Sequence, residues 1–326
     1  MDSEFTALRR LSAQAGANPL LVQAAGGNTS LKDAAVMRIK ASGTWLAHAL
    51  ERDIFVAVDL PRLRAALERG DADCETPHVF ASPDNPAGLR PSIETTVHAL
   101  MPQKAVVHVH CVETIAWAVL ADAEALLAEP LAAFRWAFIP YARPGLPLAR
   151  AIQRRLAPDT QVLVLGNHGL VVAAETVEAA EYLLERVVSA LRRPVRDAVA
   201  PDRAALAAAC AGSDYAPASS DETHALATDG PALAHGANAV FYPDHVVFLG
   251  VGVATGMAGG APLVALAGKG TVIRKDAKAA VEPMGRCLAD VMRRVGHSDI
   301  LVGLQAEDID RLVNWDAEKY RQGLPR

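Results

Sequence analysis

Cysteine is scarce in this sequence, with four residues among 326. The four, Cys74, Cys111, Cys210 and Cys287, are scattered, and none belongs to a C-x-x-C pair. This spacing predicts neither a disulfide framework nor a thiolate zinc site. Free or buried thiols in a reducing compartment are the simpler interpretation. The first ten residues also lack the apolar core of a signal peptide, so we expect a cytoplasmic protein.

Long basic runs and uninterrupted apolar runs are also missing. No basic run is longer than Arg192-Arg193 and the formal net charge is −5, which argues against a nucleic-acid-binding surface. The longest apolar stretch, residues 246–267, is interrupted by several glycines and a proline, so we expect no membrane span. Hydrophobic residues nevertheless make up 51% of the chain, which predicts a folded protein with a well-buried core.

Strand-like and helix-like segments alternate up to about residue 200. Short apolar runs predict strands at residues 37–40, 54–58, 105–109, 162–165 and 170–172. Helical spacing of apolar residues predicts helices at residues 92–100, 113–120, 146–156 and 175–191. The last helix is the clearest, because Thr176 can cap its N-terminus.

Residues 193–236 differ in character, since they hold four prolines and clusters of Gly, Ser and Asp. We interpret this segment as a connection that carries one helix, at residues 202–211. Beyond it, the pattern predicts strands at residues 239–241, 246–249, 263–267 and 270–274, and a helix at 277–294. The sequence therefore predicts two units, a larger one of residues 1–200 and a smaller α/β unit of residues 216–326.

Two histidines stand at alternate positions of a predicted strand, in the sequence Val107-His108-Val109-His110. Alternate residues of a strand point to the same face, so His108 and His110 project together while the valines pack on the other side. Two imidazoles at this spacing can bind one metal ion. Two partly buried histidines at a strand end explain the pattern equally well.

A third histidine, His168, lies between two glycines at the tip of a predicted strand pair, in the sequence Gly166-Asn167-His168-Gly169. Glycine lets the backbone turn sharply and come close to a site. Three histidines would leave metal positions open for a substrate, as a catalytic metal requires. Taken alone, the segment is better explained as an ordinary β-turn.

A carboxylate and two small-residue loops complete the set. Glu94 follows Pro91 and Ser92 in the first turn of a predicted helix, where it can act as a proton-transfer group or as an ordinary N-terminal helix residue. The segments 25–30 and 40–44 are rich in NH and OH donors and can hold an anion, although such loops are common.

Together these segments resemble the class II aldolase/adducin family, which includes fuculose-phosphate and rhamnulose-phosphate aldolases. The resemblance covers residues 5–191 of this chain. It rests on GGNTS at residues 26–30, ASGT at 41–44, PSIE at 91–94, HVH at 108–110, IPYARPG at 139–145 and NHGL at 167–170.

The resemblance implies a class II aldolase-like α/β/α sandwich with a central, mainly antiparallel sheet, usually in a homotetramer with its site at a subunit interface. By position, His108, His110 and His168 would bind Zn²⁺, or another divalent transition metal, and Glu94 would be the acid/base. A phosphate or carboxylate of a small sugar-derived substrate would be held by Gly27, Asn28, Ser42, Gly43 and Ser92.

The reaction implied is reversible carbon–carbon cleavage of a ketose phosphate, or of a related hydroxyketone or hydroxy acid, through an enediolate. Tyr141 is a candidate for activating a substrate hydroxyl. An epimerase or decarboxylase could use the same site, and a non-catalytic adducin-like binding module is a third alternative.

Two features depart from the sugar-phosphate aldolases. Ile93 stands where they often carry a second serine, and the C-terminal unit is like the extension of longer family members, some of which add a dehydrogenase. No G-x-G-x-x-G follows a predicted strand, so dehydrogenase activity is not expected. His245 next to Asp244, and the glycine-rich run 250–260, could face the site, but a surface turn and a structural loop are the better interpretations.

Overall fold

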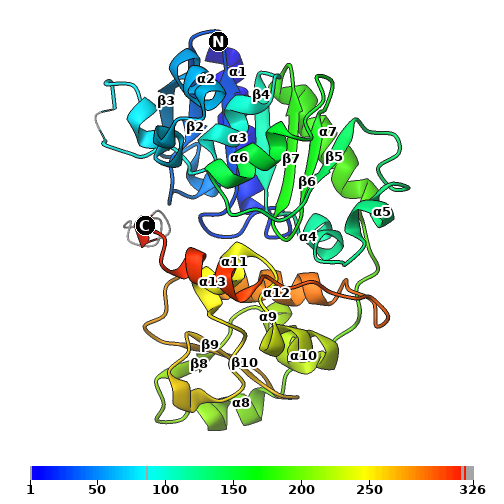
Figure 1. Cartoon of the computed structure of the whole chain (residues 1–326). Helices are drawn as coiled ribbons and strands as arrows, with labels where there is room; N and C mark the ends of the chain where they lie inside the picture. Colours follow the sequence, from blue (N-terminus) through cyan, green and yellow to red (C-terminus); the bar gives the residue numbers. More distant parts are fainter. Residues whose placement is uncertain (1, 86, 317–318, 321–326) are drawn as a thin grey trace.

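A computed structural model describes residues 2–85, 87–316 and 319–320 of the chain, which form a larger N-terminal unit and a smaller C-terminal unit (Figure 1). The larger unit is built on a seven-stranded sheet of order β3-β2-β1-β4-β7-β6-β5. The strands are β1 (Asn28–Lys32), β2 (Val36–Lys40), β3 (Phe55–Asp59), β4 (Ala105–Val109), β5 (Trp136–Ile139), β6 (Val162–Leu165) and β7 (Gly169–Ala174). All neighbours pair antiparallel except β5 and β6. The predicted α/β fold with a mainly antiparallel sheet is confirmed.

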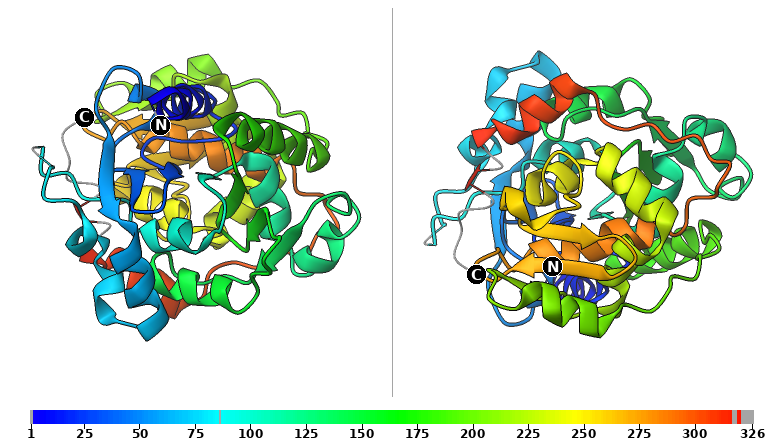
Figure 2. Two further views of the ribbon diagram at one scale, coloured as in Figure 1. Left: turned by 90° about the horizontal axis from the view of Figure 1, so that it is seen from above. Right: turned by 90° about the horizontal axis from the view of Figure 1, so that it is seen from below.

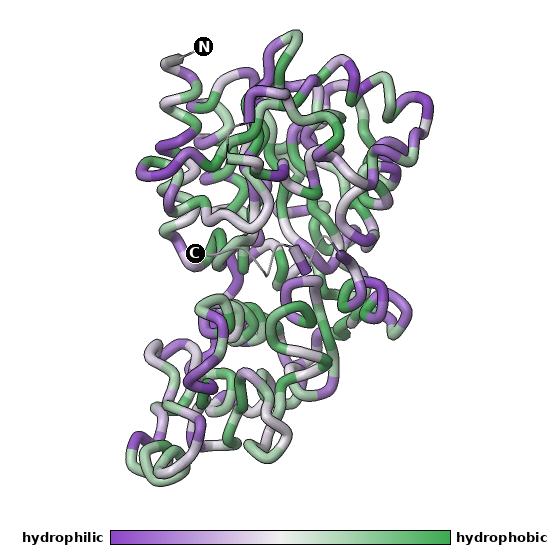
Figure 3. Tube along the Cα trace, turned by 90° about the vertical axis from the view of Figure 1, so that its left-hand side faces the viewer, coloured by the Kyte–Doolittle hydropathy of each residue, from purple (hydrophilic) through white to green (hydrophobic). Residues whose placement is uncertain are grey.

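Helices cover both faces of this sheet. Helices α1 (Asp2–Ala17) and α7 (Val177–Ala190) lie side by side on one face, where they pack against Val107 and Val109 of β4 (Figure 2). The opposite face is covered by α2 (Leu60–Arg69), α3 (Thr95–Leu100) and α6 (Leu146–Gln153), and Val106 of β4 packs there with residues of α3 and α6. Hydrophobic segments run through the middle of the larger unit, and hydrophilic segments are concentrated at its outer edge (Figure 3). The alternation of β4 thus separates an apolar face from the face that carries His108.

Strand β1 was not expected, because residues 25–30 were interpreted as a loop. Its residues Asn28 and Ser30 pair with β4 and Lys32 pairs with Met37 of β2, and all three are buried. Ser30 Oγ lies 2.7 Å from His98 Nδ1, and Lys32 Nζ donates to the carbonyls of His98 and Met101. These polar partners explain why the strand lacks the apolar alternation on which its prediction would depend.

The smaller unit contains a three-stranded antiparallel sheet of order β8-β10-β9, formed by β8 (Tyr215–Pro217), β9 (Leu263–Leu266) and β10 (Gly270–Arg274). Its helices are α8 (Arg203–Cys210), α9 (Asp221–Thr228), α10 (Gly230–Asn238), α11 (Pro243–Leu249), α12 (Val281–Met292) and α13 (Ala306–Val313). Two short helices, α4 (Val112–Ala118) and α5 (Ala123–Leu127), belong to the larger unit. Helices α11, α12 and α13 lie along the boundary and face the larger unit (Figure 1).

Three predictions for the C-terminal half are wrong. Residues 246–249 belong to helix α11 rather than to a strand, and residues 239–241 form neither a strand nor a helix. The segment 193–236 carries α8, β8, α9 and most of α10 rather than one helix, and α8 packs on β8 and β10. The division into domains of residues 1–200 and 216–326 stays a prediction, although the regular elements of the smaller unit begin at residue 203. Among the described residues, no helix is long and apolar enough to cross a membrane.

Candidate metal centre

Strand β4 places the first two histidines. His108 pairs with Asn28 of β1 across the sheet, and His110 follows directly after the strand ends at Val109. Both histidines are buried, and the valines between and before them pack on the opposite face, as the alternation predicts.

His168 lies in the turn between β6 and β7. The turn is possible because Asn167 adopts a left-handed backbone with φ +52° and because Gly169 has no side chain. A Cβ atom at Gly169 would lie 2.5 Å from the carbonyl oxygen of Val109. Glycine therefore allows the turn to approach β4, and the ligand atoms of His108, His110 and His168 lie within 4.8 Å of one another.

The environment of the histidines favours their neutral, ligand form. His108 Nδ1 lies 3.0 Å from the carbonyl oxygen of Leu170, to which the protonated Nδ1 donates, so the lone pair of Nε2 faces the cluster. Burial lowers the pKa of His108, and it lowers the pKa of His168 to about 3. Neutral imidazole is the form that binds a metal ion.

Glu94 precedes α3 and faces two of these histidines. Its Oε2 is 3.3 Å from His108 Nε2, its Oε1 is 3.5 Å from His168 Nε2, and the Asn28 amide donates to Oε2 at 2.8 Å. Burial by itself raises the pKa of Glu94, but His108, His168, His110 and Asn28 lower it to about 2. The carboxylate is therefore ionised at neutral pH.

These groups fit a divalent cation. Two buried atoms of this cluster, His108 Nε2 and Glu94 Oε1, have no hydrogen-bond partner among the described residues. Buried polar atoms without partners are costly, and a cation held by the imidazole nitrogens would satisfy Nε2 and offset the negative charge of the nearby carboxylate. Nitrogen donors of this kind suit zinc, and they also suit other transition metals.

A glycine-rich cavity opens onto this cluster. The residues expected to hold a substrate anion all line it, together with Glu94, His110 and His168; they are Gly27, Asn28, Ser42, Gly43 and Ser92. Asn28 also donates to Ser92 Oγ at 3.0 Å, which ties two of these groups together.

Lys40 also lines this cavity, although the sequence did not single it out. It ends β2, its side chain is buried, and its Nζ donates to the carbonyl of Ala25 at 2.9 Å. A lysine directly before a small-residue loop is the signal that could have identified it. The buried cation makes the cavity suitable for a negatively charged group.

Two further expectations turn out differently. Asp244 was predicted to lie in a surface turn, but it is buried in α11 and its Oδ2 lies 2.8 Å from His110 Nδ1. Tyr141 packs with Val240 and Leu312 rather than among the lining residues of the cavity. The structure thus adds a carboxylate to the site and places the tyrosine elsewhere.

Comparison with known protein families and sequences finds matches for the N-terminal part of the chain. A family profile described as the Class II Aldolase and Adducin N-terminal domain matches residues 8–193. YuxG of Bacillus subtilis (strain 168), an uncharacterized oxidoreductase, is 30% identical over 190 residues, which are 53% of this chain and 27% of that protein. The chain thus spans about a quarter of the length of this curated relative.

Solved structures with a similar fold include the N-terminal class II aldolase domain of a conserved protein from Thermoplasma acidophilum. It has a TM-score of 0.51 and 26% identity, over 59% of this chain and 93% of that one. YgbL from Klebsiella pneumoniae, described as a candidate aldolase, epimerase or decarboxylase, has a TM-score of 0.45 and 21% identity, over 59% of this chain and 87% of that one.

Proposed function

Because the chain belongs to the class II aldolase and adducin N-terminal domain family, we propose that it is a metal-dependent aldolase that cleaves a carbon–carbon bond reversibly. The observation that carries the proposal is the cluster of three buried histidines beside the ionised Glu94. A binding module without catalysis has no need of a buried carboxylate against such a cluster. The substrate class is a small, sugar-derived hydroxyketone or hydroxy acid.

His108, His110 and His168 would hold the metal, with zinc as our first choice. When bound, a divalent ion supplies Lewis-acid polarisation of carbonyl and hydroxyl oxygens. The histidines contribute neutral nitrogen donors, of which His108 is fixed in orientation by its bond to Leu170.

The anionic end of the substrate would lie in the glycine-rich part of the cavity. Lys40 provides a positive charge there, and Ser42 and Ser92 provide hydroxyl groups. Gly27 and Gly43 have φ angles of +60° and +77°, which lets their backbone curve around a bound group. A phosphate or a carboxylate fits this set of donors.

Glu94 would transfer a proton to and from the substrate carbon that lies beside the carbonyl group. Its ionised carboxylate can accept a proton from the carbon beside the carbonyl in the condensation direction, and return it to the enediolate in the cleavage direction. Asn28 and its hydrogen bond hold one oxygen of the carboxylate in place. Burial keeps bulk water away from this step.

The test is a screen of ketose phosphates, hydroxyketones and hydroxy acids for aldehyde release by the metal-loaded protein. Glu94→Gln should keep the metal and the fold, but lower turnover roughly 10²–10⁴-fold, because the amide cannot carry the proton. A Glu94→Gln protein with full metal and near-normal turnover would remove Glu94 from the mechanism. Release of CO₂, or an epimer without aldehyde, would assign the site to a decarboxylase or an epimerase instead. A homotetramer also stays a prediction.

A further inference from the structure

The C-terminal unit reaches the histidine cluster through Asp244. This residue is in the first turn of α11, outside the residues 8–193 that the family profile matches. Its carboxylate is buried, lines the cavity, and lies with Oδ2 2.8 Å from His110 Nδ1. Two elements far apart in the sequence therefore meet at one imidazole.

The contact between Asp244 and His110 affects which ring nitrogen of His110 carries the proton and how the ring is oriented. The Asp244 carboxylate lies 2.8 Å from Nδ1, and its negative charge favours the tautomer of His110 that carries the proton on Nδ1 and the lone pair on Nε2. Gly26 lies on the same side of the ring, where a Cβ would be 2.8 Å from Nδ1. The imidazole is held between a carboxylate and a close backbone, which fixes both its tautomer and its orientation.

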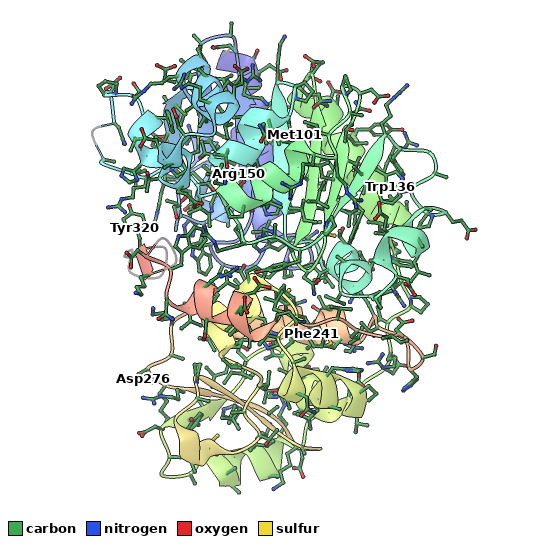
Figure 4. The ribbon with its side chains drawn as sticks, in the orientation of Figure 1. Met101, Trp136, Arg150, Phe241, Asp276 and Tyr320 are labelled. Carbon is green, nitrogen blue, oxygen red and sulfur yellow. The ribbon has the colours of Figure 1, made fainter. Side chains whose placement is uncertain are left out.

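A second contact links the same unit to the third histidine. The side-chain amide of Asn167, the residue before His168, donates to the carbonyls of Phe241 at 2.9 Å and Val302 at 2.7 Å. Phe241 lies at the boundary between the two units (Figure 4). The left-handed turn that presents His168 is thus fastened to the C-terminal unit.

We infer that the C-terminal unit helps to form the metal centre. Asp244 positions His110, and the carbonyls of Phe241 and Val302 position the turn that carries His168. The inference rests on the proposed function, because it takes the three histidines as metal ligands. Asp244 is a positioning residue, since it acts through His110. Loss of a carboxylate that positions a ligand histidine typically lowers metal affinity by roughly 10–100-fold.

The test measures Co²⁺ affinity and the Co²⁺ d–d absorption band of the full-length chain, by competition with a chelator. Asp244→Asn should bind Co²⁺ about 10–100-fold more weakly and shift the band at full loading, because the amide no longer fixes the His110 tautomer. Asp290→Asn is the matched control, since Asp290 is a buried carboxylate of α12 that pairs with Arg286 and Arg294. An affinity within twofold of the wild type, an unchanged band, or equal losses in both variants would overturn the inference.

Asn167→Gly is a second test variant. Glycine tolerates the left-handed backbone at this position, but the change removes both hydrogen bonds that the Asn167 side-chain amide donates. It should weaken Co²⁺ binding severalfold, and unchanged affinity would remove the turn from the inference. His110→Ala separates this inference from the proposed function. Loss of metal in His110→Ala together with normal binding in Asp244→Asn would leave the proposed function standing while the inference fails.

Discussion

Lys32 is a charged side chain buried in the middle of the seven-stranded sheet. Burial, together with repulsion from Arg64, lowers its pKa to about 7, and its Nζ donates to two backbone carbonyls. In the unfolded chain the pKa is near 10.5, so between about pH 7 and 10.5 the unfolded state binds more protons than the folded state. Folding should therefore become more favourable as the pH rises through this window.

The prediction is tested by urea unfolding of the wild type and Lys32→Met between pH 6.5 and 9.5. The wild-type free energy of unfolding, minus that of the variant, should rise with pH by at most about 1.4 kcal/mol per unit. The matched control is Lys104→Met, which removes an exposed rather than a buried lysine. A difference that is flat across the range would contradict the assignment.

Single residues of the site differ in how far the sequence could predict them. His108 and His110 were predicted to share a face because strand alternation is a local rule. In the structure their ligand atoms lie together, while Val107 and Val109 pack on the other face. Asp244 could not be placed in the same way, because its contact with His110 depends on how two distant segments pack. The roles of these residues in binding and catalysis stay predictions.

Helix α7 is the element whose limits follow most directly from the sequence. Thr176 was expected to cap it, and its side chain accepts a hydrogen bond from the Ala179 amide at 3.1 Å. Thr176→Ala should lower the free energy of unfolding by about 1 kcal/mol without changing metal content. Ser189→Ala, at an exposed position of the same helix, is the control and should not destabilise the protein.

Urea unfolding at fixed pH compares these two variants. Equal stability of Thr176→Ala and the wild type would show that the cap contributes nothing. A loss of bound metal in Thr176→Ala would contradict the prediction, because it would mean that the helix is coupled to the histidine cluster.

Elements with weak or mixed patterns were missed for physical reasons. Strand β1 buries polar residues against α3, so its sequence lacks the alternation of a half-buried strand. Helix α11 contains a run of four apolar residues, 246–249, which is too short to distinguish a strand from a helix. Pro243 and Asp244 in its first turn were the helix signals that should have decided the matter.

The larger and the smaller unit are connected by residues 192–202, which form neither a helix nor a strand. Val195 and Val199 are exposed there, whereas residues 203–238 form three helices and a strand. Limited proteolysis of the native protein should therefore cut first within residues 192–202. Mass spectrometry of the early fragments locates the cut, and first cuts within 203–238 or within α7 would count against the proposed boundary.

The most direct test of the central claim is metal analysis of the purified full-length protein. We expect close to one divalent ion per chain, and we expect His110→Ala to lose most of it while His78→Ala, an exposed histidine away from the cluster, keeps it. Inductively coupled plasma mass spectrometry gives the metal-to-protein ratio for all three proteins. A His110→Ala protein with the wild-type metal content would contradict the assignment of the three histidines as the metal site.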